Sequence, residues 1–175
     1  MKIIDLSLEM YDKMPVFPGD PEVRIETIEQ VIEGNDWFMK GITMSSHDGT
    51  HVNIPAHTKR DGKTLDEYPL ERFCGDAVLY ENKEDLQKGI GVIFDSKHEF
   101  TKELAHIAIN REVSFIGVTN DFDLDVERYT LDHDLISFER LVNTDKLPKR
   151  FTFFGMPLKI KEGDGSPVRA FAVVK

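Results

Sequence analysis

Short runs of alternating or mainly apolar residues mark the strands that this sequence predicts. Alternation with a period of two is typical of a half-buried strand, and a short apolar run is typical of a buried one. The predicted strands cover residues 3–8, 23–28, 38–45, 77–81, 91–95, 113–119, 151–160 and 167–174. Glycine and charged residues at 162–165 provide a turn between the last two.

Helical spacing of apolar residues is found over residues 101–110. Residues 121–134 are strongly acidic and are predicted to be exposed, while residues 135–142 fit either a helix or a strand. Strands therefore dominate, and the pattern predicts a mixed α/β fold with mixed sheets and helices packed on one side. The length of 175 residues fits a single domain that spans residues 1–175.

Charge and cysteine content narrow the possible partners. The formal net charge is −10 at pH 7, which disfavours binding to nucleic acid or to anionic lipid. No segment has the length of a membrane span, and the N-terminus lacks the apolar core of a signal peptide. Cys74 is the single cysteine, so no disulfide can form within the chain. We therefore expect a cytoplasmic location.

Candidate chemistry is concentrated in residues 46–57, which contain three of the six histidines. If this segment is extended, then His47, His51, Asn53 and His57 share one face because they are separated by even numbers of residues. Neutral imidazoles are good ligands for zinc or manganese. The other interpretation is a polar surface loop, but three histidines on one face around Gly49 favour a site.

The segment reads H-D-G-T-H-V-N-I-P-A-H and closely resembles the H-x-G-T-H-x-D-x-P-x-H motif of the cyclase family. This family of metal-dependent hydrolases includes bacterial kynurenine formamidases and isatin hydrolase-like enzymes. The aromatic-Pro-Gly-Asp loop at Phe17, the stretch at residues 69–77 and the C-terminal region from residue 157 are also similar to the family. The resemblance is weakest over residues 81–134, and it implies the cyclase-like swivelling β/β/α fold.

The resemblance also implies residue roles. His47 and His51 become metal ligands, His57 becomes the catalytic acid–base, and Phe17 lies near the substrate. The family's aspartate is replaced by Asn53, a neutral amide that cannot bridge two cations as a carboxylate does. Asn53 either coordinates one ion or only hydrogen-bonds the loop.

In the family, a later histidine and glutamate complete a second metal site. Glu139 resembles that glutamate. The family's histidine lies further upstream than His133, so His133 joins the site only if the intervening turn is shorter, and otherwise is an exposed residue. We expect one divalent ion rather than two, zinc in preference to manganese.

The resemblance predicts a metal-dependent hydrolase that acts on a small amide and forms a homodimer or a larger homo-oligomer. Two alternatives stay open. One is an altered or inactive family member that binds a small ligand, which the replacement at Asn53 favours. The other is a single-metal enzyme that hydrolyses lactones or imides.

Overall fold

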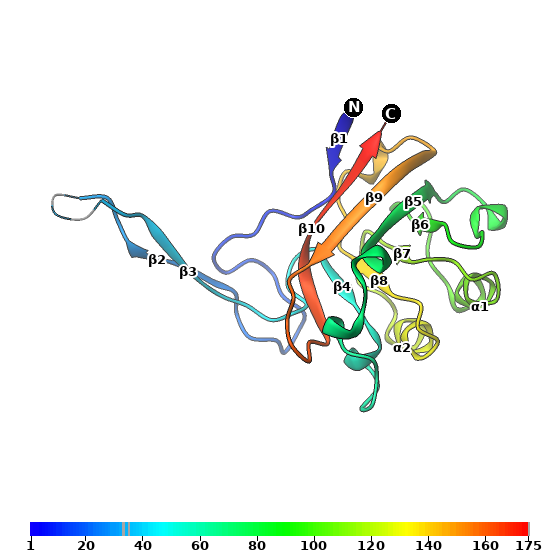
Figure 1. The fold of residues 1–175 in the computed structure, drawn as a ribbon, viewed down its shortest axis with the longest axis horizontal. Helices are drawn as coiled ribbons and strands as arrows, with labels where there is room; N and C mark the ends of the chain where they lie inside the picture. The colour runs from blue at the N-terminus through cyan, green and yellow to red at the C-terminus, as the bar shows by residue number, and fades with distance from the viewer. Residues whose placement is uncertain (33, 35, 175) are drawn as a thin grey trace.

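The computed structural model describes residues 1–32, 34 and 36–174. The described strands and helices follow one another along the chain as shown in Figure 1. They are β1 (Lys2–Asp5), β2 (Arg24–Glu29), β3 (Met39–Thr43), β4 (His51–Asn53), β5 (Cys74–Leu79), β6 (Gly91–Ile93), α1 (Lys102–Asn110), β7 (Ile116–Gly117), α2 (Leu124–Asp132), β8 (Ser137–Glu139), β9 (Arg150–Pro157) and β10 (Gly165–Val174).

The main sheet has the strand order β1-β10-β4-β8-β7-β6-β5-β9. Strand β9 also pairs with β10, so the sheet closes on itself. Neighbours from β5 to β8 run parallel, and the other pairs are antiparallel. The expected mixed α/β fold is therefore confirmed.

Apolar side chains form two clusters on the two faces of this sheet. One cluster includes the aromatic residues Phe115, Phe138 and Phe153, all fully buried. The other joins strands β5–β7 to the helices, with Leu104 of α1 and Val126 of α2 among its members. Both helices lie beside the same part of the sheet in Figure 1, as expected for helices packed on one side.

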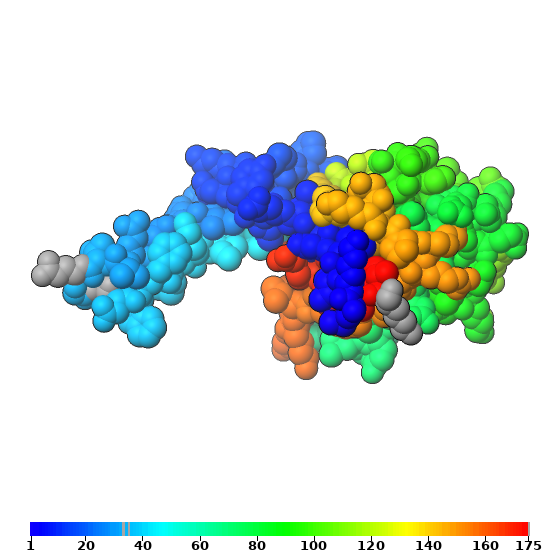
Figure 2. Space-filling model, turned by 90° about the horizontal axis from the view of Figure 1, so that it is seen from above, coloured from blue at the N-terminus to red at the C-terminus, as the bar shows by residue number. Residues whose placement is uncertain are grey.

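Strands β2 and β3 form a separate two-stranded antiparallel sheet. This hairpin projects away from the rest of the molecule in two perpendicular views (Figures 1 and 2). We call residues 24–43 the arm. Its strands match the alternating patterns predicted at residues 23–28 and 38–45.

Helix α1 confirms the predicted helix. Residues 121–134 are mostly exposed, as predicted, but they contain helix α2, whose buried inner face was not predicted. Asp123 caps α2 by accepting hydrogen bonds from the backbone N–H groups of Asp125 and Val126. The buried face of α2 consists of Val126, Glu127, Thr130 and Leu131. Two of these four residues are polar, which explains why an apolar periodicity is not visible in the sequence.

Among the residues described, no helix has the length and apolar character that crossing a membrane requires.

Candidate metal and catalytic site

The pairing of β4 with β8 and β10 brings residues that are distant in sequence next to the histidine segment. Strand β4 lies between β10 and β8, so that His51 is opposite Glu139 and Asn53 is opposite Gly165. Residues 164 and 139 are therefore neighbours of the histidine segment in space although they are far away in sequence. Helix α2 completes the group through Glu127, whose Oε1 lies 3.9 Å from His57 Nε2.

The three motif histidines converge, as predicted. The ring centroids of His47 and His57 are 3.8 Å apart, and those of His47 and His51 are 5.2 Å apart. The expectation that an extended segment aligns them was wrong, because only residues 51–53 form a strand. His47 lies in a turn where Gly49 has a φ of 65°, and His57 ends a 3-10 helix that begins at Pro55.

Thr50 of the motif connects three parts of the chain. Its hydroxyl donates to the Arg140 carbonyl at 2.7 Å and accepts from the Leu8 backbone N–H at 2.8 Å. Arg140 has a φ of 56°, an uncommon conformation for a residue that is not glycine. These bonds fix the chain directly after Glu139 and so help to position its carboxylate.

The surroundings of His51 fix which ring nitrogen carries the hydrogen and keep the ring uncharged. It is buried, and its Nδ1–H donates to the Gly49 carbonyl at 2.9 Å, which leaves a lone pair on Nε2. Burial lowers the pKa of His51 to about 4, so the ring is neutral at pH 7. Glu139 Oε2 lies 3.4 Å from His51 Nε2. Burial, reinforced by the nearby Glu127, raises the pKa of Glu139 to about 8.

Asn53 is fully buried and takes part in orienting His47. Its Oδ1 accepts a hydrogen bond from His47 Nδ1 at 2.8 Å, and its Nδ2 has no hydrogen-bond partner. The interpretation of Asn53 as a hydrogen-bonding residue therefore has direct geometric support. Its only oxygen is already engaged, which leaves little capacity to coordinate a metal ion.

Asp164 was not identified from the sequence, although it contacts two of the three histidines. Its Oδ2 lies 2.9 Å from His47 Nε2 and 3.4 Å from His57 Nδ1. Hydrogen-bonding contact with the His47 and His57 rings holds the pKa of Asp164 well below its usual value, and the bond that Asp164 accepts from His57 raises the pKa of His57. His47, His57 and Asp164 form a group whose ligand atoms all lie within 4.8 Å of one another.

His133 does not join this group, so its assignment as a ligand was wrong. It follows the last residue of α2, is exposed, and bonds through Nδ1 to the Tyr129 carbonyl. The buried acidic residue that α2 does bring to the site is Glu127, six residues earlier. Because α2 was not predicted, its inward face could not be assigned.

A cavity of about 460 Å³ lies over the cluster. The three histidines line its polar part together with Glu127, Glu139 and Asp164. Phe17, Phe122 and Leu124 add apolar surface, and Phe17 is 43% exposed. Phe17 therefore lines the cavity that contains the histidines.

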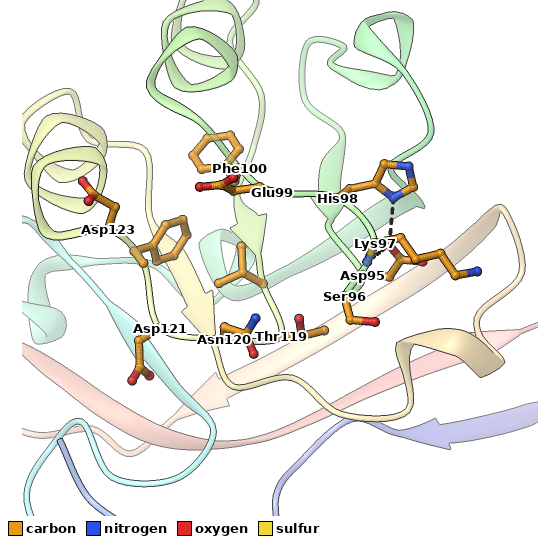
Figure 3. A pocket seen from close by; sticks show the side chains of 12 residues that line it. Asp95, Ser96, Lys97, His98, Glu99, Phe100, Thr119, Asn120, Asp121 and Asp123 are labelled. Carbon is orange, nitrogen blue, oxygen red and sulfur yellow. Dashed lines mark hydrogen bonds and ion pairs between the residues drawn. The ribbon is translucent and has the colours of Figure 1, made fainter.

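A second cavity, of about 390 Å³, adjoins the first and shares Asp121 and Phe122 with it (Figure 3). Its buried carboxylate, Asp95, accepts hydrogen bonds from the ring of His98 at 2.7 Å and from the Lys97 backbone N–H at 3.0 Å. Asp95 is thus already engaged by its own loop. Asp121 in the shared wall forms two hydrogen bonds to Arg140, at 2.5 and 3.1 Å.

The chain is similar to known proteins over most of its length. The sequence profile of the family described as "Putative cyclase" matches residues 4–103. A kynurenine formamidase of Salinibacter ruber is 28% identical over 204 residues, with 97% of this chain and 96% of the relative covered. A kynurenine formamidase of Bacillus anthracis is 24% identical over 200 residues, with 97% and 96% covered.

Solved structures share the fold. Isatin hydrolase A from Labrenzia aggregata superposes with a TM-score of 0.81 at 23% identity, covering 99% of this chain and 94% of the other. A predicted metal-dependent hydrolase from Bacillus stearothermophilus gives a TM-score of 0.77 at 22% identity, with 98% and 97% covered. The expected cyclase-like fold is thereby confirmed.

Proposed function

Because this chain belongs to the cyclase family, we propose that it is a metal-dependent hydrolase that cleaves the carbon–nitrogen bond of a small amide. The observation that carries the proposal is the convergence of His47, His51 and His57 with the carboxyl groups of Glu127, Glu139 and Asp164 in one cavity. The relatives named kynurenine formamidase and the structural neighbour named isatin hydrolase support an amide substrate.

The residues present fit a divalent cation. His51 is neutral and keeps a free Nε2, and Glu139 beside it is a carboxyl group that burial holds in its protonated form. A cation between them would stabilise the charged form of Glu139. We propose that His47, His51 and Glu139 hold one zinc ion, since imidazole nitrogen and carboxylate oxygen are common zinc ligands.

When bound, the ion would supply Lewis acidity that activates water and polarises the substrate carbonyl. His57 is placed to move the proton. Its Nδ1 contacts Asp164, its Nε2 faces Glu127 in the cavity, and its side chain is 32% exposed, so it remains accessible to substrate. His57 would accept a proton during attack and return it to the leaving nitrogen.

The cavity has the size of a small-molecule site, which is typically about 300–1,000 Å³. Phe17, Phe122 and Leu124 would cover an apolar or aryl part of the substrate. The polar groups would face the amide. An aryl amide or a cyclic amide is therefore the substrate class that this lining fits best.

A substrate panel tests the function. We expect the zinc-loaded protein to hydrolyse N-formyl aryl amines or cyclic amides, and His57→Asn to lower kcat by about 100-fold or more with unchanged zinc content. His106→Asn is the matched control, because His106 lies on α1 and contacts Tyr129 rather than the cavity. Turnover of lactones or imides alone would favour the other single-metal enzyme. No turnover of any substrate would favour the ligand-binding alternative.

We also propose that the protein is a homodimer or larger. The arm supports this, since Ile28, Phe38 and Ile42 are each at least 60% exposed on a projecting hairpin. An isolated two-stranded hairpin is marginally stable in water and needs a packing partner. We retain the expected cytoplasmic location as part of the proposal, since a single free cysteine suits a reducing compartment.

A further inference from the structure

The amide at position 53 leaves the histidine motif without its carboxylate. Asn53 Oδ1 accepts from His47 Nδ1, and the amide carries no charge. The ligand positions of the motif then supply imidazoles but no carboxylate, and Asp48 of the same segment does not line the cavity. Among the described residues, Asp164 is a carboxylate that forms a group with His47 and His57 whose ligand atoms lie within 4.8 Å of one another.

The hydrogen bond from His47 Nδ1 to Asn53 determines whether Nε2 of a neutral His47 ring carries a hydrogen or a lone pair. A neutral imidazole has one N–H, so donation from Nδ1 to Asn53 leaves a lone pair on Nε2. That lone pair lies 2.9 Å from Asp164 Oδ2. Two lone pairs this close repel each other unless a proton or a metal cation lies between them.

The spacing is compatible with a shared cation. Zinc binds imidazole nitrogen and carboxylate oxygen at about 2.0–2.2 Å, so two ligands of one tetrahedral ion lie about 3.3 to 3.6 Å apart. His47 Nε2 and Asp164 Oδ2 are 2.9 Å apart, so they would have to separate by only a few tenths of an ångström to share an ion. His57 Nδ1, at 3.4 Å from the same oxygen, could donate a hydrogen bond to a coordinated carboxylate.

Asp164 is held in place by its surroundings. Its Oδ1 accepts from the Ser46 hydroxyl at 2.9 Å, directly beside His47. The preceding Gly163 carbonyl accepts from the Leu65 backbone N–H at 2.9 Å. At the following residue, a Cβ on Gly165 would lie 2.5 Å from His47 Cε1, so only glycine allows His47 to come this close.

We propose that Asp164 supplies, in addition to Glu139, the anionic metal ligand that the residue at position 53 does not provide, and that Asn53 acts instead by orienting His47. This inference rests on the proposed function, because it assumes that the site binds a divalent ion. It assigns the anionic ligand to the β9–β10 turn rather than to the histidine motif. The ring of His47 would then be held by Asn53 through Nδ1 and would bind the ion through Nε2.

Zinc affinity of the purified full-length chain tests the inference. Zinc is added to metal-free protein in competition with a chromophoric chelator, and cobalt substitution reports the ligand set through its absorption spectrum. Removal of outer hydrogen-bond partners of a ligand typically weakens metal binding by about 10 to 100-fold. We therefore expect Asp164→Asn to weaken zinc binding by more than about 100-fold and to change the cobalt spectrum.

Two further variants separate a ligand from a positioning residue. Ser46→Ala removes only the bond that anchors Asp164 and should weaken zinc binding by about 10-fold or less. Asn53→Asp combined with Asp164→Asn moves the carboxylate into the motif and should restore most of the affinity. Thermal unfolding of each metal-free variant, matched to wild type, shows that the fold is retained.

The inference is overturned if Asp164→Asn binds zinc as tightly as wild type, or if the double variant fails to recover affinity while remaining folded. Binding of no zinc by wild type would overturn it as well. Failure of the ligand assignment can be distinguished experimentally from failure of the proposed hydrolase function. Loss of zinc in Asp164→Asn without any amide turnover by wild type would leave the ligand assignment intact and refute the hydrolase.

Discussion

His51 and Glu139 lie opposite each other on β4 and β8, and each is held in its uncharged form by burial. As the pH rises, the two residues therefore change the stability of the fold in opposite directions. The lowered pKa of His51 contributes stability that is present above pH 6.5 and is lost as the pH falls through about 4. The raised pKa of Glu139 contributes stability that is present below pH 4.5 and is lost as the pH rises through about 8.

Between pH 6.5 and 8 only Glu139 of this pair titrates, and this gives a testable difference. We expect the free energy of unfolding of the metal-free wild type to fall by about 2 kcal/mol more over this interval than that of Glu139→Gln. Urea denaturation in EDTA at a series of pH values measures it. The carbonyl of glutamine can still accept the hydrogen bond that the Phe122 backbone N–H donates to Glu139.

Added zinc provides the control for this prediction. A bound cation favours the ionised carboxylate, so the difference between wild type and Glu139→Gln should shrink or reverse when zinc is present. If the stability of wild type and of Glu139→Gln in EDTA changes equally with pH across the whole interval, then Glu139 is ionised in the folded metal-free protein.

At the residue scale, the motif was sufficient to predict that His47, His51 and His57 converge. Asp164 was not predicted because its contact with His47 depends on the register of β10 against β4, over a separation of 117 residues. The turn that contains Asp164 was recognised, but a turn in sequence does not say what it faces. His133 was considered because the family has a histidine upstream of the glutamate, whereas the residue of α2 that faces the site is Glu127.

At the element scale, the patterns located most strands but not the reason for their close packing. Two glycines make room for aromatic rings inside the closed sheet. A Cβ at Gly91 would lie 2.1 Å from Phe115, and one at Gly155 would lie 2.5 Å from Phe138. Glycine weakens a strand pattern in sequence, yet here it is what permits large rings to fill the interior.

Substitution of Gly155 should therefore destabilise the protein. We expect Gly155→Ala to lower the free energy of unfolding by about 1–3 kcal/mol, because the added methyl group overpacks the interior. Its Cβ would meet both Phe138 and Phe153. Denaturant titration of the metal-free protein measures the loss.

A double-mutant cycle checks the cause. Phe138→Leu removes the ring atoms nearest to position 155, so the cost of Gly155→Ala should be smaller in the Phe138→Leu background than in wild type. An equal cost in both backgrounds would mean that the ring is not what Gly155 accommodates.

At the scale of the whole molecule, the closed sheet contrasts with the arm. The sheet buries Phe115, Phe138 and Phe153 in its interior. The arm instead projects away from that core with apolar side chains exposed (Figure 2). The alternating pattern of residues 23–28 and 38–45 predicted two strands correctly. It did not predict that they pair only with each other, because alternation does not say which face of a strand has a covering partner.

The arm makes the proposed assembly testable. We expect the triple variant Ile28→Thr, Phe38→Ser, Ile42→Thr to run as a single chain in light scattering after gel filtration, while wild type has the mass of two or more chains. Large exposed apolar patches mark interaction sites, and these three side chains are 60–61% exposed on the hairpin. Leu70→Ser is the matched control, because Leu70 is 62% exposed but lies on the body of the molecule. The arm is not the interface if the triple variant keeps the wild-type mass, or if Leu70→Ser dissociates the assembly equally well.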